Sequence, residues 1–368
     1  MKSLVLTLLL GAALFGPAAA EEDVRLATIH LPEGFVIEAF AAVPNARQMA
    51  WGEKGTLFVG TRREGRVFAV TDEDGDGRGE RVREIASGLR MPSGVAFRDG
   101  ALYVAAVSTI FRFDDIEVRL DDPPAPAVVT DRLPSDGHHG WKVLEFGPDG
   151  LLYLPVGAPC DVCRTEGYHG TILRMHPDGS GIETYARGLR NSVGLAWHPV
   201  TGELWFTDNG SDHLGPDLPP DELNRAPGPG LHYGFPFCHA GTLPDPEFGG
   251  DGRCGDTEPP VQALAAHVAP LGLAIHSGTN VPQAYRGAVF IAEHGPGNRS
   301  GTIGYRVSVV RLAEDHRTAL DYAAFAQGWY GNGRGWGRPA DILEARDGSL
   351  MVSDDRAGRI YRIRYVGP

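Results

Sequence analysis

Apolar and polar positions alternate along this chain in short runs, and the runs come in pairs. Each pair contains an apolar strand, a turn rich in glycine and aspartate, and a second strand of the type Leu-aromatic-Val. Alternation over four to eight residues is typical of a half-buried β-strand, and a tight turn between two such runs indicates a hairpin. Six hairpins are predicted, at residues 49–60, 93–104, 143–157, 193–209, 272–291 and 340–352.

Six copies of one hairpin predict an all-β fold, a six-bladed β-propeller. A single four-stranded blade cannot bury both of its faces, so the blades must stack on one another around a ring. Two further strands, at residues 35–40 and 359–363, could share one blade and remove an exposed sheet edge. An array of immunoglobulin-type sandwiches would also repeat hairpins, but the spacing is too short for two-sheet domains. We therefore predict one domain over residues 21–368.

The first twenty residues have a different pattern. Lys2 precedes an apolar run over residues 4–15, and an Ala-x-Ala ending follows at Ala20. This is the pattern of a secretory signal peptide, and the run is too short to cross a membrane. We therefore expect cleavage after Ala20 and a periplasmic or secreted protein without a membrane span.

The formal net charge of −13 argues against nucleic acid as a partner. After the first twenty residues Lys54 and Lys142 are the only lysines, so arginine supplies nearly every cation. An anionic ligand would therefore be held mostly by guanidinium groups, which bind carboxylates in a fixed bidentate geometry.

The four cysteines form two local pairs. Cys238 and Cys254 flank a polar loop, and in an oxidising compartment they are expected to form a disulfide worth about 3 kcal/mol. Cys160 and Cys163 have the spacing C-x-x-C and are followed by Arg164, which excludes a c-type haem attachment site. A disulfide is our first interpretation of this pair, and a thiol redox pair is the second.

Polar residues gather at one end of the predicted hairpins. Arg190 and Asn191 precede the first strand of the fourth hairpin, and residues 208–212 (DNGSD) follow the second strand. A hairpin brings these ends together, so a cation, an amide and several oxygens converge, which suits an anion plus a metal ion. A polar hairpin end with a satisfied arginine is the alternative interpretation.

Residues 136–142 (DGHHGWK) precede the third hairpin as Arg190 and Asn191 precede the fourth. If the blades are equivalent, both segments lie at the same end of the propeller, where a neutral histidine can act as a general base. The alternative is a pair of surface histidines in a glycine turn.

An acidic run from Asp72 to Asp76 begins like a calcium loop, with the spacing D-x-D-x-D-G. Its twelfth position is Arg83 where an EF-hand has glutamate, so the pattern is incomplete. The run is either a structural calcium site or a solvated turn between strands.

Four motifs in this chain resemble the glucose/sorbosone dehydrogenase family: GLRN at 188–191, DNG at 208–210, DELN at 221–224 and HYGFP at 232–236. Proteins of that family are six-bladed propellers that use pyrroloquinoline quinone and calcium. The resemblance extends over nearly all of the chain after residue 20, and it implies both cofactors here.

The resemblance also implies quinone-binding residues. Arg190 and Asn191 match an Arg-Asn pair that contacts the quinone. Arg299 follows the fifth hairpin, where the glucose-type enzymes have a lysine that contacts the cofactor, and Arg338 matches an arginine before the sixth hairpin.

A calcium site and a base are implied in the same way. Gly210 and Ser211 match two residues whose backbone carbonyls bind calcium, although the glucose-type enzymes have proline at the second position. The family's catalytic histidine precedes a Gly-Pro-Asp turn, matched here at residues 147–149. This indicates His138, with His139 as the alternative because the spacing is one residue longer than in the glucose-type enzymes.

The resulting hypothesis is an exported quinoprotein oxidoreductase. It would oxidise an aldose or aldosone at C1 to a lactone or acid, pass hydride to pyrroloquinoline quinone, and use a quinone or cytochrome as electron acceptor. Two alternatives remain: a calcium-dependent propeller hydrolase such as a lactonase, and a non-catalytic binding propeller.

Overall fold

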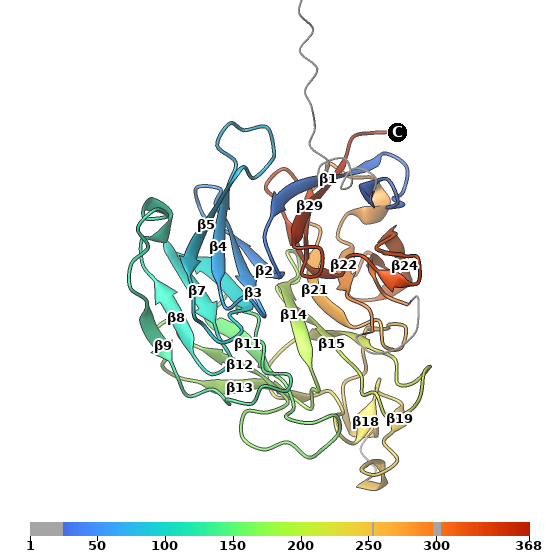
Figure 1. Ribbon diagram of the computed structural model, residues 1–368. Coiled ribbons are helices and arrows are strands. Elements are labelled where there is room, and N and C mark those ends of the chain that lie inside the picture. Colours follow the sequence, from blue (N-terminus) through green and yellow to red (C-terminus); the bar gives the residue numbers. More distant parts are fainter. Residues whose placement is uncertain (1–24, 252–253, 297–302) are drawn as a thin grey trace, which may run out of the picture.

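The structure is a computed structural model, and it describes residues 25–251, 254–296 and 303–368. The predicted signal peptide and Arg299 lie outside these ranges. Within them the secondary structure is β-strands and short 3-10 turns, at Ile116–Val118, Gly249–Asp251, Cys254–Asp256 and Gln283–Tyr285. Six sheets stand around a central axis, so the predicted six-bladed β-propeller is confirmed (Figure 1).

Five blades follow one another along the chain, each an antiparallel sheet with its first strand innermost. Blade 1 contains β2 (Ala46–Trp51), β3 (Leu57–Thr61), β4 (Val67–Thr71) and β5 (Arg81–Ala86). Blade 2 contains β6 (Gly94–Arg98), β7 (Ala101–Ala105), β8 (Ile110–Phe113) and β9 (Ala127–Thr130). Blade 3 contains β10 (Glu145–Phe146), β11 (Leu152–Val156), β12 (Thr171–Met175) and β13 (Glu183–Arg187), to which β17 (Leu231–His232) adds in parallel. Blade 4 contains β14 (Ser192–Trp197), β15 (Leu204–Asp208), β16 (Glu222–Ala226) and β20 (Gln262–Ala263). Blade 5 contains β21 (Pro270–Ile275), β22 (Val289–Glu293), β23 (Arg306–Leu312) and β24 (Ala319–Gln327).

The sixth blade joins the two ends of the described chain. It contains β27 (Pro339–Glu344), β28 (Leu350–Asp354) and β29 (Arg359–Tyr365), and its outer strand is β1 (Phe35–Ala42). The two strands pair antiparallel from Phe35 opposite Tyr365 to Ala42 opposite Arg359, with a bulge between Ala39 and Ala41. Figure 1 shows β1 in blue beside β29 in red. The predicted closure is therefore confirmed, and so are the six predicted hairpins.

Apolar side chains fill each interface between neighbouring blades. Among the described residues they form six buried clusters, one for each interface. The cluster between blades 6 and 1 contains Phe40, Val59 and Ile360, for example, and the one between blades 4 and 5 contains Trp205 and Ile291. Because each fully buried aliphatic or aromatic side chain contributes about 1.5–3 kcal/mol, these interfaces hold the ring together.

Buried polar groups tie the innermost strands to one another. The Gln48 side chain accepts hydrogen bonds from the backbone amides of Val95 and Leu144 and donates to the carbonyl of Leu144, so it joins blades 1, 2 and 3. Asp341 of blade 6 accepts a 2.8 Å hydrogen bond from the amide of Met49 in blade 1. The inner strand ends are therefore held in fixed positions.

Both expected disulfides are present, Cys160–Cys163 and Cys238–Cys254. The second ties the short hairpin β18 (Cys238–His239) and β19 (Leu243–Pro244) to the turn at residues 254–256. A second short hairpin, β25 (Tyr330–Gly331) and β26 (Arg334–Gly335), precedes blade 6. No helix in the described part of the chain is long and apolar enough to span a bilayer.

Closure of the ring by β1 can be tested by truncation. A chain that starts at Pro44 lacks β1, so it exposes the edge of β29 and removes Phe40 from its cluster. We expect it to aggregate or to lose its cooperative melting transition, because an open sheet edge and an apolar face then meet water. Circular dichroism melting and light scattering measure both effects.

The matched control is a chain that starts at Arg25, which retains β1. It should melt as a monomer with one transition. If the two chains differ by less than about 2 °C in melting temperature, an effect of roughly 1 kcal/mol for a domain of this size, the pairing of β1 with β29 is not what closes the ring.

Candidate active site

The candidate site lies at one end of the propeller. In an antiparallel blade the first strand begins where the second strand ends, so residues before β14 meet residues after β15. The segments around His139, Arg190, Arg338 and Arg62 all occupy this position in their blades. The structure therefore places the sequence-predicted residues that it describes at the same end of the propeller.

Arg190 and Asn191 are both buried, and Asp208 fixes their backbone. The two oxygens of that carboxylate accept hydrogen bonds from the amides of Arg190 and Asn191, at 3.0 and 2.7 Å. The Arg190 guanidinium forms an ion pair with Asp161 and donates to the backbone carbonyls of Asp161 and Asn209. Arg190 is therefore held rigidly, with one carboxylate as its counter-ion.

The two neighbouring histidines differ in environment. His138 is exposed, and its ring centroid lies 4.0 Å from that of His139. His139 is buried, and its backbone has a left-handed conformation with φ 47°. Its Nδ1 lies 2.9 Å from the carbonyl oxygen of Ala158. A Cβ at Gly157 would lie 2.5 Å from the His139 Cβ, so only glycine allows the end of β11 to approach His139 this closely.

Burial and the nearby Arg190 lower the pKa of His139 from 6.5 to about 3. The imidazole is therefore neutral at ordinary pH. The contact with Ala158 is satisfied when Nδ1 carries the proton, which leaves the lone pair on Nε2. His139 thus has the tautomer that a proton acceptor needs, held by a backbone carbonyl.

Arg338 lies on the blade 6 side of the site. Its Nε donates to the carbonyl oxygen of His294 at 2.9 Å, and its guanidinium lies 5.6 Å from the ring centroid of Tyr305. His294 Nε2 contacts Asp355 at 2.8 Å, and Asp355 pairs with Arg47 at 2.7 Å. Burial lowers the pKa of His294 to about 4, whereas Arg47 and His294 hold the pKa of Asp355 far below its ordinary value despite its burial.

Two arginines of blade 1 were missed in the sequence. Arg47 is buried, and its Nε has no hydrogen-bond partner in the described chain. The guanidinium of Arg62 stacks on the ring of Trp141, 3.9 Å from its centroid, and Trp141 packs edge-on to His139. Burial first, then repulsion from Arg47, lowers the pKa of Arg62 to about 10, and Arg338 adds to this repulsion.

Only the positions of Arg47 and Arg62 relative to the predicted strands could have indicated them in the sequence. Arg47 stands at the beginning of the first strand of blade 1, and Arg62 directly follows the second strand, as Asn209 follows β15 in blade 4. Reading that position in every blade, instead of only in the blades that carry family motifs, would have found both.

The segment predicted to bind calcium follows β15 in blade 4 and adjoins Arg190. The amide of Gly210 donates to Asp221 at 2.7 Å, and Ser211 is fully buried. Burial raises the pKa of Asp221 to about 7 and that of Glu222 to about 8, the latter also through repulsion from Asp208. Oxygen atoms and buried carboxylates therefore surround this loop, which is the donor chemistry that calcium prefers.

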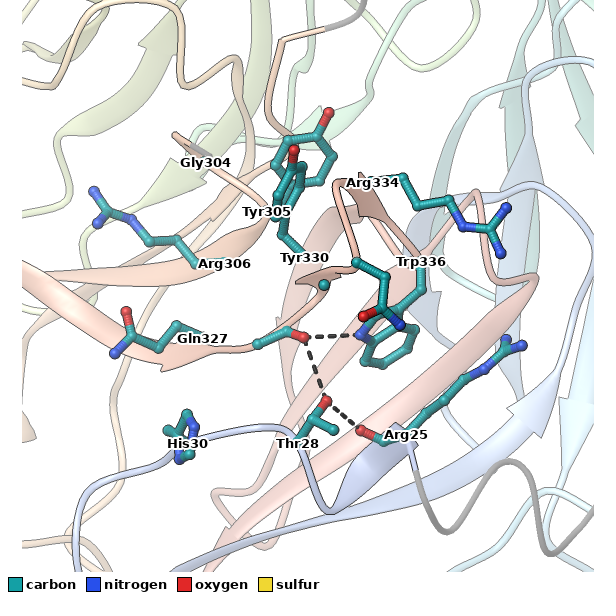
Figure 2. Close-up of a pocket in the computed structure, with 13 residues that line it drawn as sticks. Arg25, Thr28, His30, Gly304, Tyr305, Arg306, Gln327, Tyr330, Arg334 and Trp336 are labelled. Atoms are coloured by element: carbon teal, nitrogen blue, oxygen red, sulfur yellow. Dashed lines mark hydrogen bonds between the residues drawn. The ribbon is translucent and has the colours of Figure 1, made fainter. Parts of the chain in front are cut away.

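A cavity of about 850 Å³ adjoins the blade 6 side of the site. Figure 2 shows it between the N-terminal segment at Arg25 and Thr28 and the hairpin at Tyr330 and Arg334. Tyr305 lines it and also contacts Arg338, so the cavity and the site share one wall.

The acidic run forms an exposed loop on blade 1. Asp72, Asp74, Asp76 and Glu80 come close enough to hold one cation, and Asp72 accepts hydrogen bonds from the amides of Gly75 and Gly77. The loop is thus shaped as a turn by its own side chains. A calcium ion there stays a prediction.

The fold and the site together define a six-bladed β-propeller with clustered arginines at one end of its axis. The chain belongs to the glucose/sorbosone dehydrogenase family, whose model, "Glucose / Sorbosone dehydrogenase", matches residues 109–362.

Similar proteins support this assignment. An uncharacterised protein of Borreliella burgdorferi is 31% identical over 363 residues, which is 94% of this chain and 93% of that protein. The aldose sugar dehydrogenase YliI of Escherichia coli is 26% identical over 250 residues, 62% of this chain and 61% of that protein.

Solved structures share the fold. The holo form of the pyranose dehydrogenase PQQ domain from Coprinopsis cinerea matches with a TM-score of 0.77 and 16% identity, over 91% of this chain and 97% of that chain. The PQQ-bound aldose sugar dehydrogenase of Streptomyces coelicolor matches with a TM-score of 0.65 and 23% identity, over 91% and 99%.

The charge network around Asp355 makes stability depend on pH. The pKa of Asp355 in the folded protein lies below its ordinary value. Its contribution to the free energy of unfolding is therefore fully present above the ordinary pKa of about 4, and it declines as the pH falls below that value toward the folded pKa. We expect Asp355→Asn to lower the free energy of unfolding of the apo-protein by about 3 kcal/mol at pH 7, because Arg47 then loses its buried counter-ion.

Urea unfolding between pH 3 and pH 7 measures the difference in free energy of unfolding between the wild type and Asp355→Asn, and this difference should become smaller below pH 4. The control is Asp114→Asn, which removes a largely exposed pair with Arg112 and should cost less than about 1 kcal/mol. A difference that does not change with pH would contradict an ionised Asp355 as the source of the effect.

Proposed function

We propose that this protein is an exported sugar dehydrogenase that uses pyrroloquinoline quinone and calcium. The observation that carries the proposal is the cluster of arginines at the end of the axis, together with an oxygen-rich loop. Family membership favours a sugar as the substrate, and an aldose or aldosone oxidised at C1 is the class we expect. The two disulfides fit an oxidising compartment, periplasmic or extracellular.

The residues present fit the cofactor. Arg47, Arg62 and Arg338 repel one another, and Asp355 is the counter-ion that they share. Arg47 also has an unpaired buried Nε. A flat tricarboxylate would supply both the missing negative charge and the missing acceptors, while Trp141 offers an aromatic face. Arg190 and Asn191 would hold the cofactor from the side of blade 4.

The calcium ion would be held by the backbone carbonyls of Gly210 and Ser211. Bound quinone would supply a hydride acceptor for C1 of the sugar, and calcium would supply a Lewis acid that polarises the quinone carbonyl. The loop is anchored for this task, because Asp221 fixes the amide of Gly210 and Asp208 fixes the strand start at Arg190. The protein thus positions charge before any ligand arrives.

We propose His139 as the general base, although the sequence motif favoured His138. His139 lies between Arg190 and Trp141, its ring is held by Ala158, and its Nε2 has the lone pair that accepts the proton of the sugar hydroxyl. An anion bound beside Arg190 would raise the pKa of His139 toward the working range, because Arg190 is one cause of its lowering.

Cofactor binding by the arginine cluster can be tested directly. We expect the apo-protein to bind pyrroloquinoline quinone only in the presence of Ca²⁺, as measured by isothermal titration calorimetry. Arg62→Ala should weaken binding by about 10–150-fold, since a charge-assisted hydrogen bond contributes roughly 1.5–3 kcal/mol.

Arg63→Ala is the matched control, because Arg63 is the adjacent residue and is exposed. It should bind the quinone within threefold of the wild type. Calcium-independent binding, or no binding by a folded protein, would refute the proposal. Quinone-independent hydrolysis of a lactone would then favour the hydrolase alternative.

The role of His139 as general base can be tested separately from quinone binding by the arginine cluster. His139→Ala should reduce dye-linked sugar oxidation by about 10²–10⁴-fold, while quinone affinity changes less than tenfold, because the imidazole is neutral. His138→Ala should retain turnover. The reverse result, an inactive His138→Ala and an active His139→Ala, would show that the base is His138.

A further inference from the structure

Three side chains outside the proposed active site converge on one point. His213 lies in the loop that follows Ser211, and His239 and Asp245 lie on and just after the β18–β19 hairpin. Asp245 is fully buried, His239 is nearly so, and the side chain of His213 is 35% exposed. The Cys238–Cys254 disulfide holds the hairpin in place.

The two imidazoles contact the same carboxylate oxygen. His213 Nε2 lies 3.1 Å from Asp245 Oδ2, and His239 Nε2 lies 3.0 Å from it. Two ligand atoms on one zinc ion, each about 2.0–2.1 Å from the metal, are about 3.3 Å apart in tetrahedral geometry. All three ligand atoms already lie within 4.8 Å of one another, so small side-chain movements would complete the site.

The other oxygen of Asp245 is already used. Oδ1 accepts hydrogen bonds of 2.9 Å from the amides of Glu247 and Phe248, which fixes the carboxylate so that Oδ2 faces the histidines. No arginine or lysine of the described chain pairs with this buried carboxylate. A divalent cation would supply the missing positive charge.

A partner for the second ring nitrogen is also in place. His213 Nδ1 lies 2.9 Å from Ser211 Oγ. When Nε2 binds a metal, the proton of the neutral ring is on Nδ1, and this N–H can donate to the serine oxygen. Metal-binding histidines usually have such an outer hydrogen bond, which orients the ring.

We propose that His213, His239 and Asp245 bind one divalent transition-metal ion, with zinc as the first candidate. Two imidazoles and a carboxylate suit Zn²⁺ and its neighbours in the first transition row, whereas Ca²⁺ and Mg²⁺ prefer oxygen donors alone. The partial exposure of His213 leaves room for a water molecule on the metal. The ion would link the loop of Gly210 and Ser211 to the disulfide-bonded hairpin.

The test is titration of the purified apo-protein with Zn²⁺ and Co²⁺ in excess Ca²⁺, which keeps an oxygen-donor site occupied. We expect one Zn²⁺ per chain by calorimetry, and visible d–d absorption bands when Co²⁺ binds. His213→Gln and Asp245→Asn should each weaken Zn²⁺ binding at least tenfold. Both should fold, because His213 is partly exposed and asparagine keeps an oxygen for the two amides at Asp245.

The control is His176→Gln, which removes an exposed histidine of blade 3 and should bind Zn²⁺ like the wild type. Unchanged affinity in both His213→Gln and Asp245→Asn would overturn the proposal, as would the absence of saturable binding by the folded wild type. In that case the three side chains form a hydrogen-bonded cluster without a metal. Since the readout is metal binding, the outcome is independent of the proposed dehydrogenase activity.

Discussion

The structure depends on the need of every blade to bury two apolar faces. A four-stranded sheet with one covered face would leave half of its Val, Leu and Phe side chains in water, so each blade is stable only between two neighbours. The condition is satisfied everywhere at once only if the ring closes. The ring is closed by β1, which comes from the beginning of the described chain and pairs with β29 near its end.

Closure also makes the site. The groups that cluster near the axis come from blades that are distant in sequence, such as Arg47 from blade 1, Arg190 from blade 4 and Arg338 from blade 6. Like charges do not gather without an external cause, because each pair repels and each loses hydration. The apolar interfaces supply that cause, and the stacked blades keep these guanidinium groups close together although their own interactions oppose it.

The sequence predicted the parts that have a local signature. Alternating runs and Gly-Asp turns predicted the six hairpins, because strand period and turn chemistry act over a few residues. The family resemblance made Arg190 and Arg338 candidate site residues. Arg62 was missed because the run TRREGR does not by itself show which of its arginines stacks on a ring and which, like Arg63, stays exposed. That difference is created only when Trp141 of another blade packs against one of them.

The sequence alone left the choice between His138 and His139 open for a related reason. The two residues have the same chemistry and adjacent positions, and a spacing count has an uncertainty of one residue wherever a loop changes length. Only the fold shows that one ring lies against Gly157 and the carbonyl of Ala158 while the other remains exposed. Metal-ligand spacing gave no warning of His213, His239 and Asp245 either, since two separate loops supply them.

The arrangement of charge has one more consequence. The guanidinium groups of Arg47, Arg62 and Arg338 come from blades 1 and 6, and the buried carboxyl groups of Asp208, Asp221 and Glu222 come from blade 4. In the proposed function, an anion held by the arginines and a cation held near the carboxyl groups would each relieve a repulsion that the fold maintains. In the proposed function each ligand would also attract the other, so binding of one would raise the affinity for the other, and linkage requires the two effects to be equal. In the proposed function, a joint requirement for both ligands follows from this distribution of charge.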